Sequence, residues 1–236
     1  MTLDLPYFEE LGGLTTRAED FVARHAVWIE DAPAEEYRRE WLGRGVPAEL
    51  MDRMAAFGER WGGLVLPPTP EYSGGPRCLA ASPIDPDYGR GRFGAGSARA
   101  AVPYGFMIGP VGEFGIAVND RHNWTPLHAS VEGWVEALAL SYHASLASEH
   151  VTRCHGDDVE KIVLDGFEPV REVRGLADTW WRGADSLVAM YAGEATCLYA
   201  PQTRSAVVYS GMDRWGLHGG VEEADVAALA ERWTSP

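Results

Sequence analysis

The chain has 236 residues, of which 46% are hydrophobic and 11% aromatic, enough for a sizeable core in one large domain or two small ones. Its 35 acidic and 20 basic side chains give a net charge of −15, which disfavours direct binding to nucleic acid and favours a basic protein partner. No stretch approaches the roughly 20 apolar residues of a membrane span, and the start MTLDLPYFEE is acidic where a signal peptide is basic, so we expect a cytoplasmic protein without a membrane partner.

The first 30 residues contain a predicted helix. Thr16-Arg17-Ala18-Glu19 has the pattern of a capping box, and apolar or aromatic residues then recur at helical spacing as far as Ile29. We therefore predict a helix from about Thr16 to Glu30. The segment EEYRREWLGRG predicts a second, shorter helix that ends near Gly43.

A third helix is the strongest periodic signal in the chain. Pro47 stands where first-turn prolines stand, and one apolar stripe follows it, made of Leu50, Met54, Phe57 and Trp61. Gly62-Gly63 then predicts a turn into a short strand, because glycine accepts the left-handed conformation that closes a helix.

The middle of the chain predicts a long loop followed by a hairpin. Residues 67–103 are rich in Gly, Pro, Asp and Ser, which is typical of a surface excursion. The runs VPYGFMIG and EFGIAV flank a Gly-Pro-Val-Gly turn and predict two paired strands, and WTPLH predicts a third. Ser130 is then the predicted N-cap of a helix that carries Trp134 and Leu138.

The last third of the chain predicts further strands and helices. DDVEKIVLDG predicts a short helix, a strand is expected near 169–173, and SLVAMY, ATCLYA and SAVVYSG are β-rich runs. VEEADVAALAERW predicts a C-terminal helix. The whole pattern predicts an α+β fold, with N-terminal helices packed on a mainly antiparallel sheet and further strands and a helix at the C-terminus. We place one domain at 1–150 and a C-terminal extension at 151–236, which could belong to the same domain.

Two motifs invite a chemical interpretation. GRGRFGAGS (89–97) is glycine-rich like a phosphate loop, but no strand precedes it and no Lys-Ser/Thr pair follows, so we interpret it as a flexible loop. CHGDD places Cys154, His155, Asp157 and Asp158 together, which could form a metal or acid–base site. Its spacing matches no known metal signature, and the attraction of carboxylates to a helix N-terminus explains the two aspartates.

We therefore predict no metal and no cofactor. The three cysteines are widely spaced and form no CxxC pair, so we expect reduced thiols and not a disulfide framework. There is no GxSxG nucleophile motif either. Catalysis is less expected than binding, and a small enzyme using His155, Asp157 and Asp158 stays an alternative.

The segment DTWWRGADS holds the candidate partner-binding residues. Trp180 and Trp181 stand side by side between Asp178 and Asp185, and an exposed Trp flanked by acids suits a cationic protein partner. Neighbouring side chains on a strand face opposite ways, so at least one ring is expected in the core. Core packing of both rings is the competing interpretation.

The segment from Glu36 to Gly63 resembles the SUKH superfamily of immunity and scaffold proteins. The features that carry the resemblance are Leu42-Gly43, the run Val46-Pro47-Ala48-Glu49-Leu50, Phe57, and Trp61-Gly62-Gly63. EFGIAVND and SVEGWVEALAL resemble the middle strands and the Trp-containing helix of that family, so the similarity covers about residues 30 to 150. The loop at 67–103 is long for the family, and residues 151–236 have no counterpart in it.

The resemblance implies a non-catalytic immunity protein that neutralises a toxin domain, often a nuclease, in the bacterial cytoplasm. The acidity of the chain points the same way, because a nuclease is basic where it binds phosphate. Residues 1–60 carry 13 acids and 7 bases, 61–129 carry 5 of each, and 130–236 carry 17 acids and 8 bases. A general acidic scaffold module is a further alternative.

Overall fold

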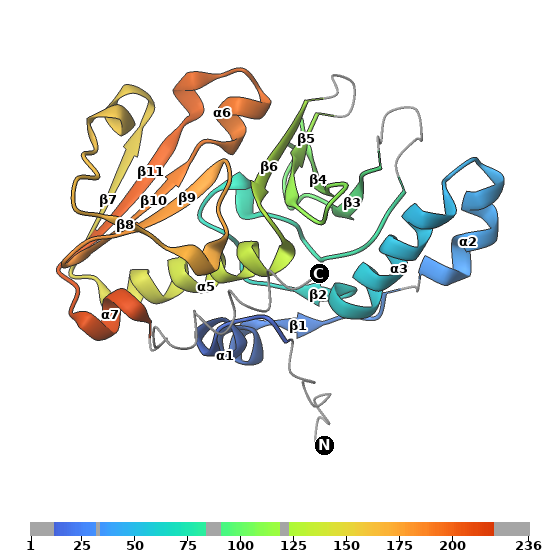
Figure 1. Cartoon of the computed structure of the whole chain (residues 1–236), viewed down its shortest axis with the longest axis horizontal. Coiled ribbons are helices and arrows are strands. Elements are labelled where there is room, and N and C mark those ends of the chain that lie inside the picture. Colours follow the sequence, from blue (N-terminus) through green and yellow to red (C-terminus); the bar gives the residue numbers. More distant parts are fainter. Residues whose placement is uncertain (1–11, 32–33, 84–90, 119–122, 220–236) are drawn as a thin grey trace.

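The computed structural model describes residues 12–31, 34–83, 91–118 and 123–219, and it has an α+β fold (Figure 1). The three predicted N-terminal helices are present as α1 (Thr16–His25), α2 (Ala34–Gly43) and α3 (Ala48–Trp61). Helix α1 ends five residues before the predicted end at Glu30. The reason is that β1 (Val27–Trp28) leaves the helix and pairs in antiparallel fashion with β2 (Leu64–Val65).

The turn after α3 is explained by close backbone packing. The predicted stripe of α3 is confirmed, since Leu50, Met54, Phe57 and Trp61 are all buried in the same core. Gly63 follows with φ of +77°, and a Cβ on it would lie 2.1 Å from the carbonyl oxygen of Ile29. Only glycine fits there, so the second glycine allows β2 to lie directly against β1.

A four-stranded antiparallel sheet occupies the middle of the chain. It contains β3 (Phe93–Gly96), β4 (Gly105–Ile108), β5 (Phe114–Ala117) and β6 (Trp124–His128), in the order β3-β4-β5-β6. The predicted hairpin and the WTPLH strand are therefore confirmed. The interpretation of 67–103 as a loop misses β3 and the short 3₁₀ helix η1 (Tyr72–Gly74). A Cβ on Gly96 would lie 2.0 Å from the carbonyl oxygen of Cys78, so only glycine allows β3 to pack against the segment around Cys78.

A second antiparallel sheet has five strands in the order β7-β11-β10-β9-β8 (Figure 1). Its strands are β7 (His150–His155), β8 (Glu168–Pro169), β9 (Asp178–Arg182), β10 (Ser186–Tyr191) and β11 (Ser205–Ser210). Three short 3₁₀ helices lie between them: η2 (Gly156–Lys161), η3 (Arg171–Val173) and η4 (Pro201–Thr203). Two short α-helices complete this half, α6 (Gly193–Cys197) and α7 (Arg214–His218).

Several predictions for this half are wrong in detail. The β-rich run ATCLYA is helical in α6 and not a strand, and DDVEKIVLDG forms a 3₁₀ helix where an α-helix was expected. Strand β7 was not predicted, and the strand expected near 169–173 is only β8, followed at once by η3. The predicted C-terminal helix, VEEADVAALAERW, lies outside the described residues.

Helix α5 (Val131–Ala147) joins the two sheets, and its predicted cap is confirmed because Ser130 Oγ accepts a hydrogen bond from Gly133 N. Its side chains belong to two cores. Trp134 and Leu138 pack with the four-stranded sheet and α3, while Leu140 and Ala144 pack with the five-stranded sheet. This explains why the first eleven residues of the helix are buried almost all round, while its last turns have an exposed face.

Backbone and ionic contacts also connect the sheets. The segment that enters β9 is bonded to β6, since Leu176 N donates to the Leu127 carbonyl at 2.8 Å. A buried ionic network links α1, α5, η3 and β9 through Arg17–Glu136 (2.9 Å), Arg17–Glu172 (3.6 Å) and Arg182–Glu172 (3.1 Å). The boundary between residues 150 and 151 stays a prediction.

Candidate functional site

The predicted partner-binding residues do not form one surface. Asp178 and Trp180 are each 1% exposed, and Trp180 stacks on Tyr209 with ring centroids 5.8 Å apart. Trp181 is half-buried on the opposite face of β9, where its Nε1 donates to Thr179 Oγ1, and Asp185 is exposed in the turn after β9. The alternation of the strand sends Asp178 and Trp180 towards α5, so neither can touch a partner in the folded chain.

The residues of the enzyme alternative are separated from the cavities of the protein. His155 ends β7 and is exposed, Asp157 is exposed in η2, and Asp158 pairs with Lys161 at 2.6 Å on the surface. None of them lines either cavity described below. Within the described ranges, no group of three His, Cys, Asp or Glu residues could hold a metal ion.

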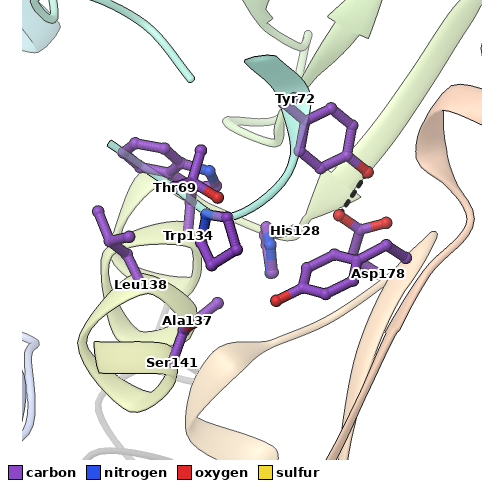
Figure 2. A pocket seen from close by; sticks show the side chains of 10 residues that line it. Thr69, Tyr72, His128, Trp134, Ala137, Leu138, Ser141 and Asp178 are labelled. Carbon is purple, nitrogen blue, oxygen red and sulfur yellow. Dashed lines mark hydrogen bonds between the residues drawn. The ribbon is translucent and has the colours of Figure 1, made fainter. Parts of the chain in front are cut away.

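Asp178 is the centre of a buried polar cluster between the two sheets (Figure 2). Tyr72 Oη donates to Asp178 Oδ2 at 2.5 Å, and the backbone N–H groups of Ala192 and Gly193 both donate to Oδ1 at 3.1 Å. The carboxyl group therefore holds together β9, the start of α6 and the segment that carries Tyr72. It caps α6 from a distant strand, which explains why a β-rich sequence is helical there.

Tyr72 approaches Asp178 through an unusual turn. Tyr72 and Ser73 have φ of +54° and +49°, and Gly74 and Gly75 continue the left-handed run. Left-handed residues other than glycine are uncommon and hold only where the surroundings fix them. The buried hydrogen bond to Asp178 supplies that restraint on Tyr72.

Burial sets the protonation states of this cluster. It raises the pKa of Asp178 to about 7, although the bonds from Tyr72 and the two amides favour the carboxylate. It lowers the pKa of His128 to about 4, so His128 is neutral at pH 7 and donates from Nδ1 to the Val173 carbonyl at 2.8 Å. The pKa of Tyr72 is raised well above its usual value by burial and by Asp178.

The cavity beside this cluster is very small. It measures about 10 Å³, and its wall includes Thr69, His128, Trp134 and Ser141 (Figure 2). That volume has room for about one water molecule. The cluster therefore joins segments of the chain and has no space for a substrate.

A larger groove lies next to this cavity, and we call it the α5 groove. It measures about 240 Å³ and shares Pro70, Leu138 and Ser141 with the small cavity. Its other walls come from α1, the Pro67-Pro68 turn, α5 and the strands β7 and β11. They are Phe21, Pro67, Pro68, Tyr142, Ser145, Val151, Arg153 and Tyr209.

A cluster of exposed carboxylates lies at one end of the five-stranded sheet, and we call it the acidic corner. It consists of Glu149, Glu168, Asp185 and Asp213, all exposed. The strand registers place their segments along the same end of the sheet, from β7 at one edge to β8 at the other, because Ser210 pairs with both His150 and Ser186, and Glu168 pairs with Arg182. Met212 N also donates to the Asp185 carbonyl at 3.0 Å.

Helix α7 follows β11 at the same end of the five-stranded sheet as the acidic corner (Figure 1). Trp215 is 64% exposed and contacts the His143 ring of α5 edge-on, at a centroid distance of 4.7 Å. Leu146, one turn further along α5, is 73% exposed. Arg214 is also exposed here, whereas Arg182 is drawn inward by its bond to Glu172. This end of the sheet therefore combines an exposed aromatic side chain with an excess of exposed acids.

No helix in the described ranges has the length and apolar character needed to cross a bilayer. No protein-family model matches this chain, and no curated protein or solved structure is significantly similar to it.

Proposed function

We propose that this chain is a non-catalytic immunity protein that binds and neutralises a basic toxin domain in the bacterial cytoplasm. The single observation that carries the proposal is the acidic corner with the exposed Trp215 beside it. The SUKH resemblance of residues 30–150 supports the same function. Of the residues first considered for the interface, Asp185 stays in it and Trp181 lies on the neighbouring sheet face, while Asp178 and Trp180 are removed by burial.

The proposed interface has the parts that a fast, tight inhibitor needs. Exposed carboxylates steer a basic partner and raise the association rate, and a large aromatic side chain supplies contact area that slows dissociation. Trp215 packs edge-on against the His143 ring of α5, which restricts its orientation. A nuclease domain fits this surface because the groove that holds phosphate is basic.

The test uses purified toxin domains encoded next to the gene for this chain. We expect at least one to bind, with an association rate that falls steeply between low and high salt. Trp215→Ala should weaken the affinity by about tenfold or more, as for an interface hot spot. Asp185→Lys should slow association, whereas Glu36→Lys on α2, the same charge change on a remote helix, should have little effect.

Two results would overturn the proposal. One is that none of these domains binds. The other is binding that ignores both salt and the Trp215 and Asp185 variants, while unfolding midpoints show that each variant is folded.

A further inference from the structure

Strand β7 has one edge that is not paired with another described strand. Among the described strands, β7 is the last of its sheet and pairs only with β11. Gly156 N donates to the Arg204 carbonyl at 2.9 Å, so the alternation of an antiparallel ladder directs the backbone groups of Val151, Arg153 and His155 away from β11. An extended segment could therefore continue the sheet at this edge.

The α5 groove lies on the face of β7 that carries the side chains of Val151 and Arg153. Its volume of about 240 Å³ is below the roughly 300–1,000 Å³ of pockets that enclose drug-sized molecules. Its walls are mainly prolines, aromatic rings and aliphatic groups, with two serine hydroxyls from α5. It suits an apolar side chain projecting from a strand laid along β7 better than a free metabolite.

The charge of β7 indicates the sign of the charge on its partner. The strand HVTRCH contains Arg153 and two histidines but no acid, in a chain whose net charge is −15. Arg153 is exposed, lines the groove and forms no ion pair within 4 Å with any described residue. Glu71 interacts with Arg153 and His155 electrostatically, but it is hydrogen-bonded to Ser205 and partly buried. An exposed arginine without a close ion pair, beside an apolar groove, complements a carboxylate next to an apolar side chain.

We propose that β7 and the α5 groove bind an extended segment of a partner protein in which acidic and apolar residues alternate. The segment pairs with the outward backbone groups of β7, places an apolar side chain in the groove and faces Arg153 with a carboxylate. A second copy of this chain is a poor occupant, because pairing β7 with β7 brings two basic strands together. This site lies along the edge and one face of β7, which begins directly after Glu149 of the acidic corner, and it takes a partner of the opposite charge.

The experiment uses a fluorescein-labelled peptide of about ten residues that alternates Glu with Val and Phe, and a matched peptide with Lys in place of Glu. Fluorescence anisotropy should show the acidic peptide binding about tenfold or more tightly than the lysine peptide. Arg153→Glu should lower its affinity by about tenfold or more, and Arg153→Lys should retain most of it. Ser145→Trp, which fills the groove from the exposed face of α5, should abolish binding, whereas Leu42→Trp, which adds the same ring at an exposed position of the remote helix α2, should not change it.

Trp215→Ala serves as the control that separates this site from the acidic corner, and it should bind the acidic peptide like the wild type. The proposal is overturned if both peptides bind equally, or if Arg153→Glu or Ser145→Trp leaves the affinity unchanged. Self-association of the chain that Arg153→Glu abolishes would also overturn it, since the occupant would then be a second copy.

Discussion

The four-stranded sheet hides nearly all of its side chains, whereas the five-stranded sheet leaves one edge, one end and part of one face accessible to solvent. Every residue of β5 is buried, and β4 is buried except for its first glycine. In contrast, β7 is exposed or half-buried throughout, and β9 alternates between buried and half-buried positions. Antiparallel sheets behave in both ways, according to whether one or two faces are covered.

This difference separates the structural part of the molecule from the part available for binding. The middle segment 61–129, which forms the four-stranded sheet, carries 5 acids and 5 bases, and the segment 130–236, with the five-stranded sheet, carries 17 acids and 8 bases. Charge can accumulate only where side chains reach water, because a buried unpaired charge is costly. Both proposed binding surfaces include strands of the five-stranded sheet.

The largest expected effect is in the core of the four-stranded sheet. Phe114 is fully buried, stacks on Phe106 and contacts Trp134 at a centroid distance of 4.7 Å. Phe114→Ala should lower the free energy of unfolding by about 3–5 kcal/mol, through lost transfer energy and a cavity. Thr152→Ala in the exposed strand β7 is the matched control and should change it by about 0.5 kcal/mol or less. Urea denaturation of both variants measures this contrast, and similar losses would mean that the two sheets are equally packed.

The second expected effect is a pH dependence of stability that comes from Asp178, at the junction between the sheets. Burial raises the pKa of Asp178 from 3.8 to about 7, so the folded state binds this proton more tightly than the unfolded state. Its contribution to stability is therefore complete below about pH 4 and is lost as the pH rises to about 7. A shift of about three pKa units corresponds to roughly 4 kcal/mol.

Asp178→Asn removes this titration while its side chain can still accept from the two amides. The stability of Asp178→Asn relative to the wild type should therefore rise between pH 4 and pH 7.5, by up to roughly 4 kcal/mol. Denaturation curves of both proteins at several pH values give the difference directly. A difference that is constant with pH would show that Asp178 keeps an ordinary pKa.

The elements that could be predicted are those with local signals. The stripe of α3, the glycine turn after it and the hairpin of β4 and β5 each depend on residues close in sequence, and all are present. Helix α1 is also present, but its N-cap is Thr15, which accepts from Ala18 N, and not Thr16 of the predicted capping box. Strand β7 has no such signal, because an exposed edge strand needs no apolar alternation. The α6 helix was missed because its cap, Asp178, comes from a strand 14 residues before Ala192.

The candidate site was harder to predict than the fold. Acidic residues are almost never fully buried unless they are paired, so the sequence predicts a surface position for Asp178. Its partner Tyr72 is 106 residues away, and no spacing rule joins them. Asp213 is a favourable N-cap residue and gives a weak local signal for the helix α7 that carries Trp215. The exposure of Trp215 has no such signal, because it depends on the packing of α7 against α5.

A third effect tests the hydrogen bond that fixes the left-handed turn at Tyr72. Tyr72→Phe keeps the ring but removes the donor to Asp178 Oδ2, leaving a buried acceptor without that partner. The expected loss of unfolding free energy is about 1–3 kcal/mol. It should largely disappear when the substitution is made in Asp178→Ala, which has no acceptor, and additive losses in this double-mutant cycle would contradict the assigned bond.

The smallest expected loss of stability is that of Trp181→Ala, and it is measured against the same substitution at the neighbouring Trp180 of β9. Trp181 is half-buried on the outward face and makes one side-chain hydrogen bond, to Thr179 Oγ1 at 3.1 Å, whereas Trp180 is enclosed against Tyr209 and α5. Trp181→Ala should therefore cost only about 1 kcal/mol, near the average of point substitutions, while Trp180→Ala should cost about 3–5 kcal/mol. Thermal or urea unfolding of the two variants measures both values. Equal losses would mean that the outward face of the five-stranded sheet is as well packed as the face on α5.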